Sequence, residues 1–148
     1  MTTIRVTDDA VIPFPQEEVW KVIANVKEYP RWWPDSLSIK ILSGGDELVG
    51  TEVEIKPPGG RPFCCRIRTV GPPSVLGADY FGTLLEGRGG WRLEPVEGGT
   101  HVFYDIDVVA HGWLVDLIGK AVDFNSVHSR MMREVFICLE KELRRQRA

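Results

Sequence analysis

Three side chains of this chain have the chemistry to hold or move a proton at a binding site: His128, Tyr80 and Tyr104. A histidine transfers protons near neutral pH, and a tyrosine hydroxyl can donate a hydrogen bond to a ligand carbonyl. His128 follows Asn125 by three residues and precedes Met132 by four, so the three share one face of a helix. Simpler interpretations stay open. His128 is also explained as a half-buried histidine with a satisfied hydrogen bond, Asn125 as a local structural hydrogen-bonder, and the tyrosines as core rings.

Recognisable catalytic and metal-binding motifs are absent from the sequence. The three histidines have no metal-ligand spacing with each other or with the three cysteines. Nothing marks Cys64, Cys65 or Cys138 as a reactive thiol. The glycine-rich stretches 57–60 and 87–90 are expected to be loops between strands, and without a following helix neither predicts a phosphate site. The sequence therefore indicates no metal and no cofactor.

Size and composition limit the classes of function. The chain has 148 residues and a net charge of −3, with a pI near 5.6. This length suits a single domain, and the charge argues against non-specific binding to nucleic acid or anionic membranes. No apolar run approaches the ~20 residues of a membrane span, and the first residues do not form a secretory signal. A cytoplasmic protein with reduced cysteines is the expectation.

The first third of the chain predicts one strand and two short helical pieces. Residues 4–12 are rich in β-formers, and Pro15 suits the first turn of a helix. In that helix, apolar residues recur with helical spacing from Val19 to Val26. Residues 27–34 hold three aromatic side chains and two prolines, which limits them to a turn or half-helix. We expect Trp32 and Trp33 to plug one end of the fold, with one of them contacting a ligand.

Six further segments have the alternating pattern of strands. They cover residues 37–41, 51–56, 63–68, 75–85, 87–95 and 101–110, separated by turns rich in Gly and Pro. Strict alternation indicates antiparallel strands with one wet face. Arg66 and Arg68 fall on that polar face. The inward face of residues 75–85 stays open because the alternation there is weak.

The last third of the chain predicts one long helix over residues 114–144 with a continuous apolar stripe. Its length would be roughly 45 Å at 1.5 Å per residue. Gly119 is expected either to kink this helix or to mark its true start. A helix of this length needs an apolar surface to lie against, and the sheet is the available one.

Several segments together resemble the START and birch-pollen-allergen (Bet v 1-like, SRPBCC) superfamily, and within it the bacterial polyketide cyclase/dehydrase-type proteins. The resemblance lies in residues 12–15 leading into 18–20, residues 29–34, the strand start at 50–51, residues 99–104 and the long closing helix. It implies an α+β helix-grip fold: a curved seven-stranded antiparallel sheet wrapped around a long C-terminal helix, with two short helices between strands 1 and 2. It also implies that residues 1–148 form one ligand-binding domain. Members of this superfamily include ligand carriers, lipid or quinone binders and true cyclases.

A curved sheet gripping a helix predicts an apolar cavity between them. The residues expected to line it are Trp33, Phe63, Cys65, Ile67, Tyr80, Trp91, Tyr104, Asn125, His128 and Met132. The first hypothesis is a binder of a hydrophobic small molecule such as a lipid, quinone or polyketide-like aromatic. The second is a polyketide cyclase or dehydratase in which Tyr80, Tyr104 or His128 moves protons. The third is an interaction module. As partners we expect a hydrophobic small molecule, no nucleic acid and no membrane span, with the chain a monomer or homodimer.

Overall fold

The computed structural model describes residues 1–148 as seven strands, four α-helices and one 3-10 turn. In chain order the elements are β1 (Thr2–Ile12), α1 (Gln16–Ala24), the 3-10 turn η1 (Val26–Glu28), α2 (Tyr29–Trp32), β2 (Ser38–Ser43), β3 (Glu52–Lys56), β4 (Phe63–Gly71), β5 (Val75–Phe81), β6 (Leu85–Val96), β7 (Gly99–Ala110), α3 (Trp113–Gly119) and α4 (Phe124–Arg147).

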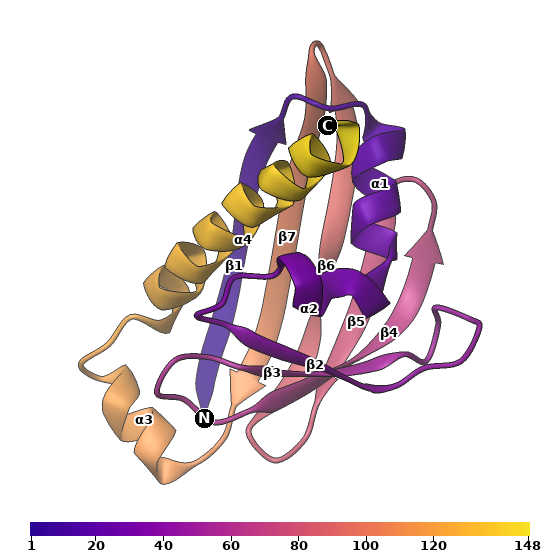
Figure 1. Ribbon diagram of the computed structural model, residues 1–148. Coiled ribbons are helices and arrows are strands. Elements are labelled where there is room, and N and C mark those ends of the chain that lie inside the picture. The colour runs from indigo at the N-terminus through magenta and orange to yellow at the C-terminus, as the bar shows by residue number, and fades with distance from the viewer.

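The strands form one antiparallel sheet in the order β1-β7-β6-β5-β4-β3-β2. Figure 1 shows that the sheet curves strongly, since β1, β7 and β6 stand upright while β2 and β3 run across them. The long helix α4 lies diagonally over the concave face, and α1 and α2 cover the remainder of that face. The expected α+β helix-grip fold, with two short helices between the first two strands, is confirmed.

Alternation along the strands decides which side chains enter the core. On β7 the buried residues include Val102, Ile106 and Val108, all at even-numbered positions. Residues two or four positions apart lie on the same face of a strand, as a strand with one wet face requires. On β5, Leu76 and Tyr80 are buried, so the even-numbered residues of that strand face inward. Arg66 and Arg68 lie on the outer face, as the pattern predicts.

The C-terminal helix differs from the sequence prediction. A single helix over residues 114–144 is wrong, because α3 ends at Gly119 and α4 begins at Phe124. Asp123 is the N-cap of α4, and its carboxylate accepts hydrogen bonds from the backbone N–H of Asn125 at 3.1 Å and the hydroxyl of Ser126 at 2.8 Å. Such a cap satisfies donors that a helix start leaves open. Four residues therefore separate α3 from α4.

The structure decides between two expectations for the glycine-rich stretch 87–90, the start of the strand 87–95 and a loop. The stretch lies within β6, and its residues pair with both β5 and β7, so the loop is wrong. The preceding strand correspondingly ends at Phe81, four residues earlier than predicted. Glycine is unfavourable in a strand interior unless another group approaches closely. At Gly89 that group is a pair of tyrosine rings, described below.

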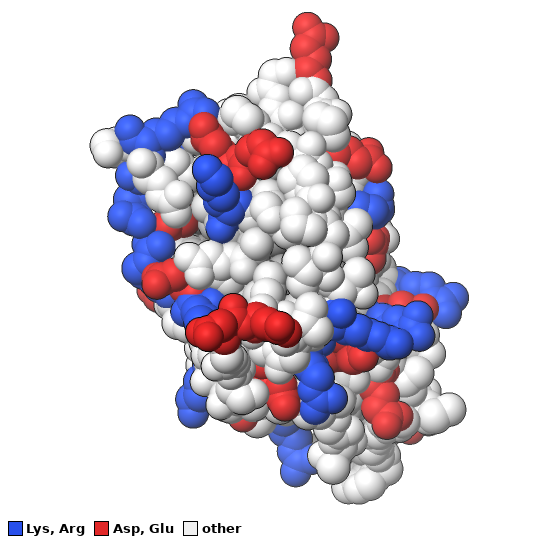
Figure 2. Space-filling view, turned by 90° about the vertical axis from the view of Figure 1, so that its right-hand side faces the viewer, with Lys and Arg blue, Asp and Glu red and all other residues white.

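Charged side chains are intermixed over the surface shown in Figure 2, where acidic and basic groups alternate around an uncharged area. One charged group is different because it is buried. The Glu142 carboxylate on α4 accepts hydrogen bonds from Arg31 of α2 at 2.7 and 3.0 Å. It accepts two more from Arg145 at 2.9 Å and one from Gln146 at 2.9 Å. This cluster ties α2 to the C-terminal half of α4.

These hydrogen bonds hold the pKa of the Glu142 carboxyl well below its ordinary value, those from Arg145 contributing most. The folded state therefore keeps Glu142 ionised at a pH where the unfolded chain takes up a proton. Stability from this group is present above about pH 4.3 and is lost as the pH falls below it.

We predict that Glu142→Gln lowers the free energy of unfolding by about 1–3 kcal/mol at pH 7, because two guanidinium groups lose their carboxylate. Chemical denaturation at pH 7 and pH 3.5 measures this. The difference between wild type and variant should shrink at the lower pH. Glu140→Gln, which removes only a surface i,i+4 pair with Arg144, is the control and should change stability by less than about 0.5 kcal/mol. Equal effects of the two substitutions would contradict the account.

Candidate functional site

A small cavity of about 50 Å³ lies on the concave face of the sheet. Twelve of its thirteen lining residues are hydrophobic. Five of the predicted site residues line it: Trp33, Cys65, Ile67, Trp91 and Tyr104. Eight others were not predicted as site residues: Val26, Tyr29, Ile39, Val53, Ile55, Leu76, Ala78 and Gly90. The walls are therefore the sheet on one side and the segment 26–33 on the other.

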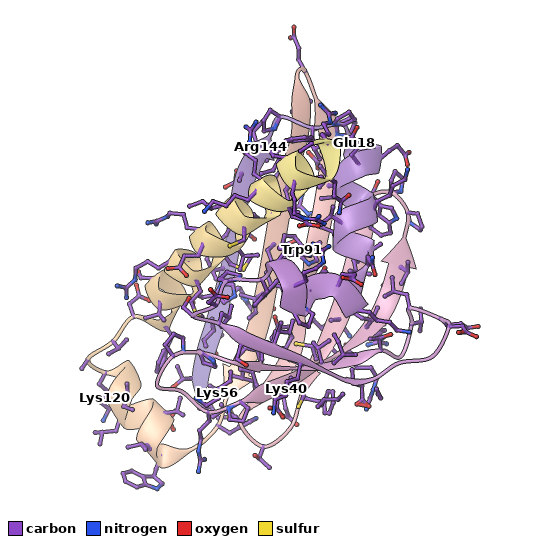
Figure 3. The ribbon with its side chains drawn as sticks, in the orientation of Figure 1. Glu18, Lys40, Lys56, Trp91, Lys120 and Arg144 are labelled. Carbon is purple, nitrogen blue, oxygen red and sulfur yellow. The ribbon has the colours of Figure 1, made fainter.

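The cavity has no wall from α4, although the sequence predicts one. On that side the space is filled, since Met132 is buried in the core and Phe136 packs edge-on against Trp91 with ring centroids 6.1 Å apart. Figure 3 shows Trp91 in the middle of the space bounded by α1, α2 and α4. The cavity thus lies between the sheet and α2, because the side chains of α4 fill the part of the concave face that α4 covers.

Two tyrosines meet over the centre of the sheet. The hydroxyl oxygens of Tyr80 on β5 and Tyr104 on β7 are 2.5 Å apart, a short hydrogen bond. The strand between them, β6, has Gly89 at this point, where a Cβ atom would lie 2.7 Å from Cε1 of Tyr80 and 3.3 Å from the Tyr104 hydroxyl. Glycine is required there because two rings converge over the bare backbone.

The chemistry of this pair is that of neutral hydrogen-bond donors. Burial is the main cause that raises the pKa of both Tyr80 and Tyr104 above the ordinary value, so both hydroxyls keep their protons at neutral pH. One proton lies between the two oxygens. The Tyr80 hydroxyl also interacts with the Cys65 thiol. Phe63 lies outside the lining and stacks on Tyr80 with centroids 5.7 Å apart.

Cys65 lines the cavity but is a poor nucleophile. Burial raises the pKa of its thiol to about 12, so the reactive thiolate is scarce at neutral pH. All three cysteines are free thiols, and no three His, Cys, Asp or Glu side chains come together as a metal site.

The outer wall of the cavity is an aromatic cluster on α2. Trp33 stacks on Tyr29 with centroids 5.2 Å apart, and Trp32 packs edge-on against both. The Tyr29 hydroxyl donates to the Ile23 carbonyl. The indole Nε1 atoms of Trp32 and Trp33 are buried and have no hydrogen-bond partner. An unpaired buried donor is unfavourable, and in Trp33 it belongs to a side chain that lines the cavity.

His128 lies beside the cavity wall, not within it. Its ring packs against the Tyr104 ring with centroids 6.0 Å apart, and its Nδ1 is 3.3 Å from the Asp8 carboxylate. Burial lowers the pKa of His128, and the negative charge of Asp8 opposes that effect. Asp8 is a site residue that the sequence interpretation missed. The signal was its even number, which places it on the inner face with Ile4, Val6 and Ala10.

Asn125 lies further from the cavity, at the edge of the sheet. Its side-chain oxygen accepts a hydrogen bond from the backbone N–H of Arg5 on β1 at 3.2 Å. The structure thus brings five of the ten predicted residues to one cavity and places Phe63, Tyr80 and His128 directly behind its walls. Asn125 and Met132 serve the edge and the core, and a part in ligand binding stays a prediction for all ten.

Comparison with known proteins decides the family. Residues 3–135 match the family model described as "Polyketide cyclase / dehydrase and lipid transport". The chain belongs to this family. A curated protein to which the chain is similar, "Persistence and stress-resistance toxin PasT" of Escherichia coli O6:H1, is 20% identical over 115 residues, covering 76% of this chain and 73% of that protein.

Solved structures share the fold of this polyketide cyclase/dehydrase-family chain. The Zhui aromatase/cyclase from Streptomyces sp. R1128 has a TM-score of 0.67 at 17% identity, covering 99% of this chain and 97% of that one. A norcoclaurine synthase mutant from Thalictrum flavum has a TM-score of 0.70 at 11% identity, covering 99% and 98%. The expected superfamily resemblance is confirmed, and at these identities the likeness concerns the fold alone.

Gly89→Ala tests the packing of the tyrosine pair. The added methyl group must displace the Tyr80 ring, so we predict a loss of about 1–3 kcal/mol in the free energy of unfolding. Urea denaturation measures the loss, and the near-ultraviolet circular dichroism of tyrosine should change with it. Gly45→Ala is the matched control, since nothing lies within 4 Å of its added Cβ. If both variants are as stable as wild type, the rings do not converge over Gly89.

Proposed function

We propose that the protein binds a hydrophobic small molecule in the cavity between the sheet and the segment 26–33. The observation that carries this proposal is an apolar hollow lined by Trp33, whose buried indole N–H has no hydrogen-bond partner. Most of the wall consists of aliphatic and aromatic side chains, which favour an apolar ligand. The description of the family, which includes lipid transport, supports the same class of ligand.

The polar groups of the wall narrow the ligand class. Trp33 offers an unpaired indole N–H, and Tyr104, which shares a hydrogen bond with Tyr80, contributes a hydroxyl group to the wall. Both are donors, and both side chains are neutral. The favoured ligand is therefore a flat apolar molecule with acceptor oxygens, such as a quinone or a polyketide-like aromatic with carbonyl groups. A hydrocarbon would leave the Trp33 donor unpaired.

Binding requires the cavity to open. A volume of about 50 Å³ is far below the ~300–1,000 Å³ of typical ligand sites. The strands are held by ladder hydrogen bonds, whereas α2 has only four residues and ends at Trp32, directly before Trp33. The segment from η1 to Trp33 is therefore the wall that moves outward when ligand enters.

Trp33→Phe tests the acceptor-oxygen requirement, because it keeps an aromatic six-membered ring and removes the N–H. We predict that wild type binds 1,4-naphthoquinone more tightly than naphthalene. The variant should bind the quinone about five- to tenfold more weakly, equivalent to about 1 kcal/mol. Its affinity for naphthalene should not change. Isothermal titration calorimetry measures both.

Trp20→Phe is the control, since Trp20 lies on α1 outside the lining. Its affinities should match those of wild type. The proposal fails if neither probe binds, or if Trp33→Phe changes both probes equally.

A second candidate function is cyclisation or dehydration of a poly-β-ketone. The buried Asp8–His128 pair beside Tyr104 favours it, because a histidine oriented by a carboxylate is suited to general acid–base work. Neutral tyrosine hydroxyls would stabilise the enolate oxygen that forms when a proton leaves the neighbouring carbon. The names of the two structural neighbours, an aromatase/cyclase and a synthase, support this class of reaction.

His128→Gln tests this second candidate. With a poly-β-ketone thioester as substrate, we predict a loss of turnover of about 100-fold or more, with uptake of 1,4-naphthoquinone unchanged. A base with a lowered pKa loses activity as the pH falls through that pKa, below 6.5. His101→Gln is the matched control, because His101 forms a similar pair with Asp9 on the outer face. Unchanged turnover in His128→Gln would exclude this role.

A further inference from the structure

The short helix α3 presents apolar side chains to solvent. It follows β7 and lies at one end of the molecule, near the N-terminus (Figure 1). None of its residues is buried. Trp113 is 77% exposed, Leu114 53%, Leu117 55% and Ile118 42%. With Val122, which is 39% exposed, this stretch of ten residues contains five of the twelve exposed large hydrophobic residues of the protein.

These side chains share one face because of their spacing. Trp113, Leu114, Leu117 and Ile118 stand at i, i+1, i+4 and i+5, which is one side of a helix. In an ordinary surface helix, an apolar face of this kind packs against the core of the protein. In α3 it faces solvent. It is therefore an unpartnered apolar face.

The opposite face of α3 is held to the body of the protein. Val115 packs against the core. The Asp116 carboxylate accepts hydrogen bonds from the N-terminal amino group of Met1 at 2.9 Å and from the Thr2 hydroxyl at 2.8 Å. The single acidic side chain of the helix is thus turned toward β1 and paired with a cation. Its outward face carries no carboxylate.

We propose that α3 docks the protein on a lipid surface. A tryptophan beside leucine and isoleucine, with a lysine at the end, is the composition that settles at the boundary between headgroups and acyl chains. Figure 3 shows Lys120 directly at the end of α3, where its ammonium can reach the phosphate level. None of the helices is both long and apolar enough to cross a membrane, so α3 lies on the surface.

The area of the patch favours lipid over a second copy of the chain. Five partly exposed side chains amount to a few hundred Å², whereas a stable dimer needs about 800 Å² from each partner with matching shapes. Lipid needs no matching shape. Because the net charge is −3, the attraction comes from apolar contact, and zwitterionic lipid is sufficient. The docking does not depend on the cavity ligand, so it is tested without one.

The experiment is flotation of the full chain with phosphatidylcholine vesicles. Wild type should float with the vesicles, and the double variant Trp113→Ser/Leu117→Ser should lose at least about tenfold in the bound fraction. Ile137→Ser, which removes an equally exposed apolar side chain from α4 (53% exposed), is the matched control and should float like wild type. Since α3 has no buried residue, the double variant should keep its circular dichroism spectrum and a Tm within about 2 °C.

Three outcomes would overturn the proposal. Wild type fails to float with phosphatidylcholine vesicles, or the double variant floats as well as wild type. In the third, sedimentation without vesicles shows a dimer that the double variant dissociates, which would make a second copy the partner of α3. Binding that requires added phosphatidylglycerol means that wild type does not float with phosphatidylcholine alone, which is the first outcome.

Discussion

The curvature of the sheet is the constraint on which the rest of the structure depends. Seven antiparallel strands bend until β2 and β3 cross the direction of β1 and β7, and the concave face needs more side-chain volume than one helix supplies. The long helix α4 fills its own half, where Phe136 meets Trp91 and Met132 is buried. The other half is covered by α1 and the short segment 26–33, and under that segment the filling is incomplete.

The incomplete half is also where the buried donors without partners lie. The indole N–H groups of Trp32 and Trp33 have none, and the Trp33 side chain lines the hollow. An unpaired buried donor lowers stability, and a ligand acceptor would recover that loss on binding. The hydrogen bonds to Glu142 hold α2 against α4, although the unpaired donor lowers stability. The wall nearest the ligand is thus fastened by a charged contact at its side and by aromatic packing at its face.

Much of the fold could be predicted from the sequence because alternation and helical spacing are local signals. The strands, their antiparallel pairing and the inward positions Cys65, Ile67, Trp91 and Tyr104 follow from them. The break before α4 was also readable, since Asp123 followed by Asn125 and Ser126 is a helix start. The site was harder. Both α4 and the segment 26–33 cover the concave face, and only one of them leaves a hollow. The difference depends on how side chains such as Phe136 fill space, and sequence spacing does not contain that information.

The central claim is that the hollow under α2 takes up an apolar ligand, and the indole N–H resonances of the five tryptophans test it directly. In a titration with 1,4-naphthoquinone followed by ¹H–¹⁵N correlation spectra, the Trp33 and Trp91 indole signals should shift and saturate together. The Trp113 signal should stay in place. If Trp33 and Trp91 remain unchanged at saturating quinone, or if only Trp113 responds, the ligand does not enter the cavity and the account is wrong.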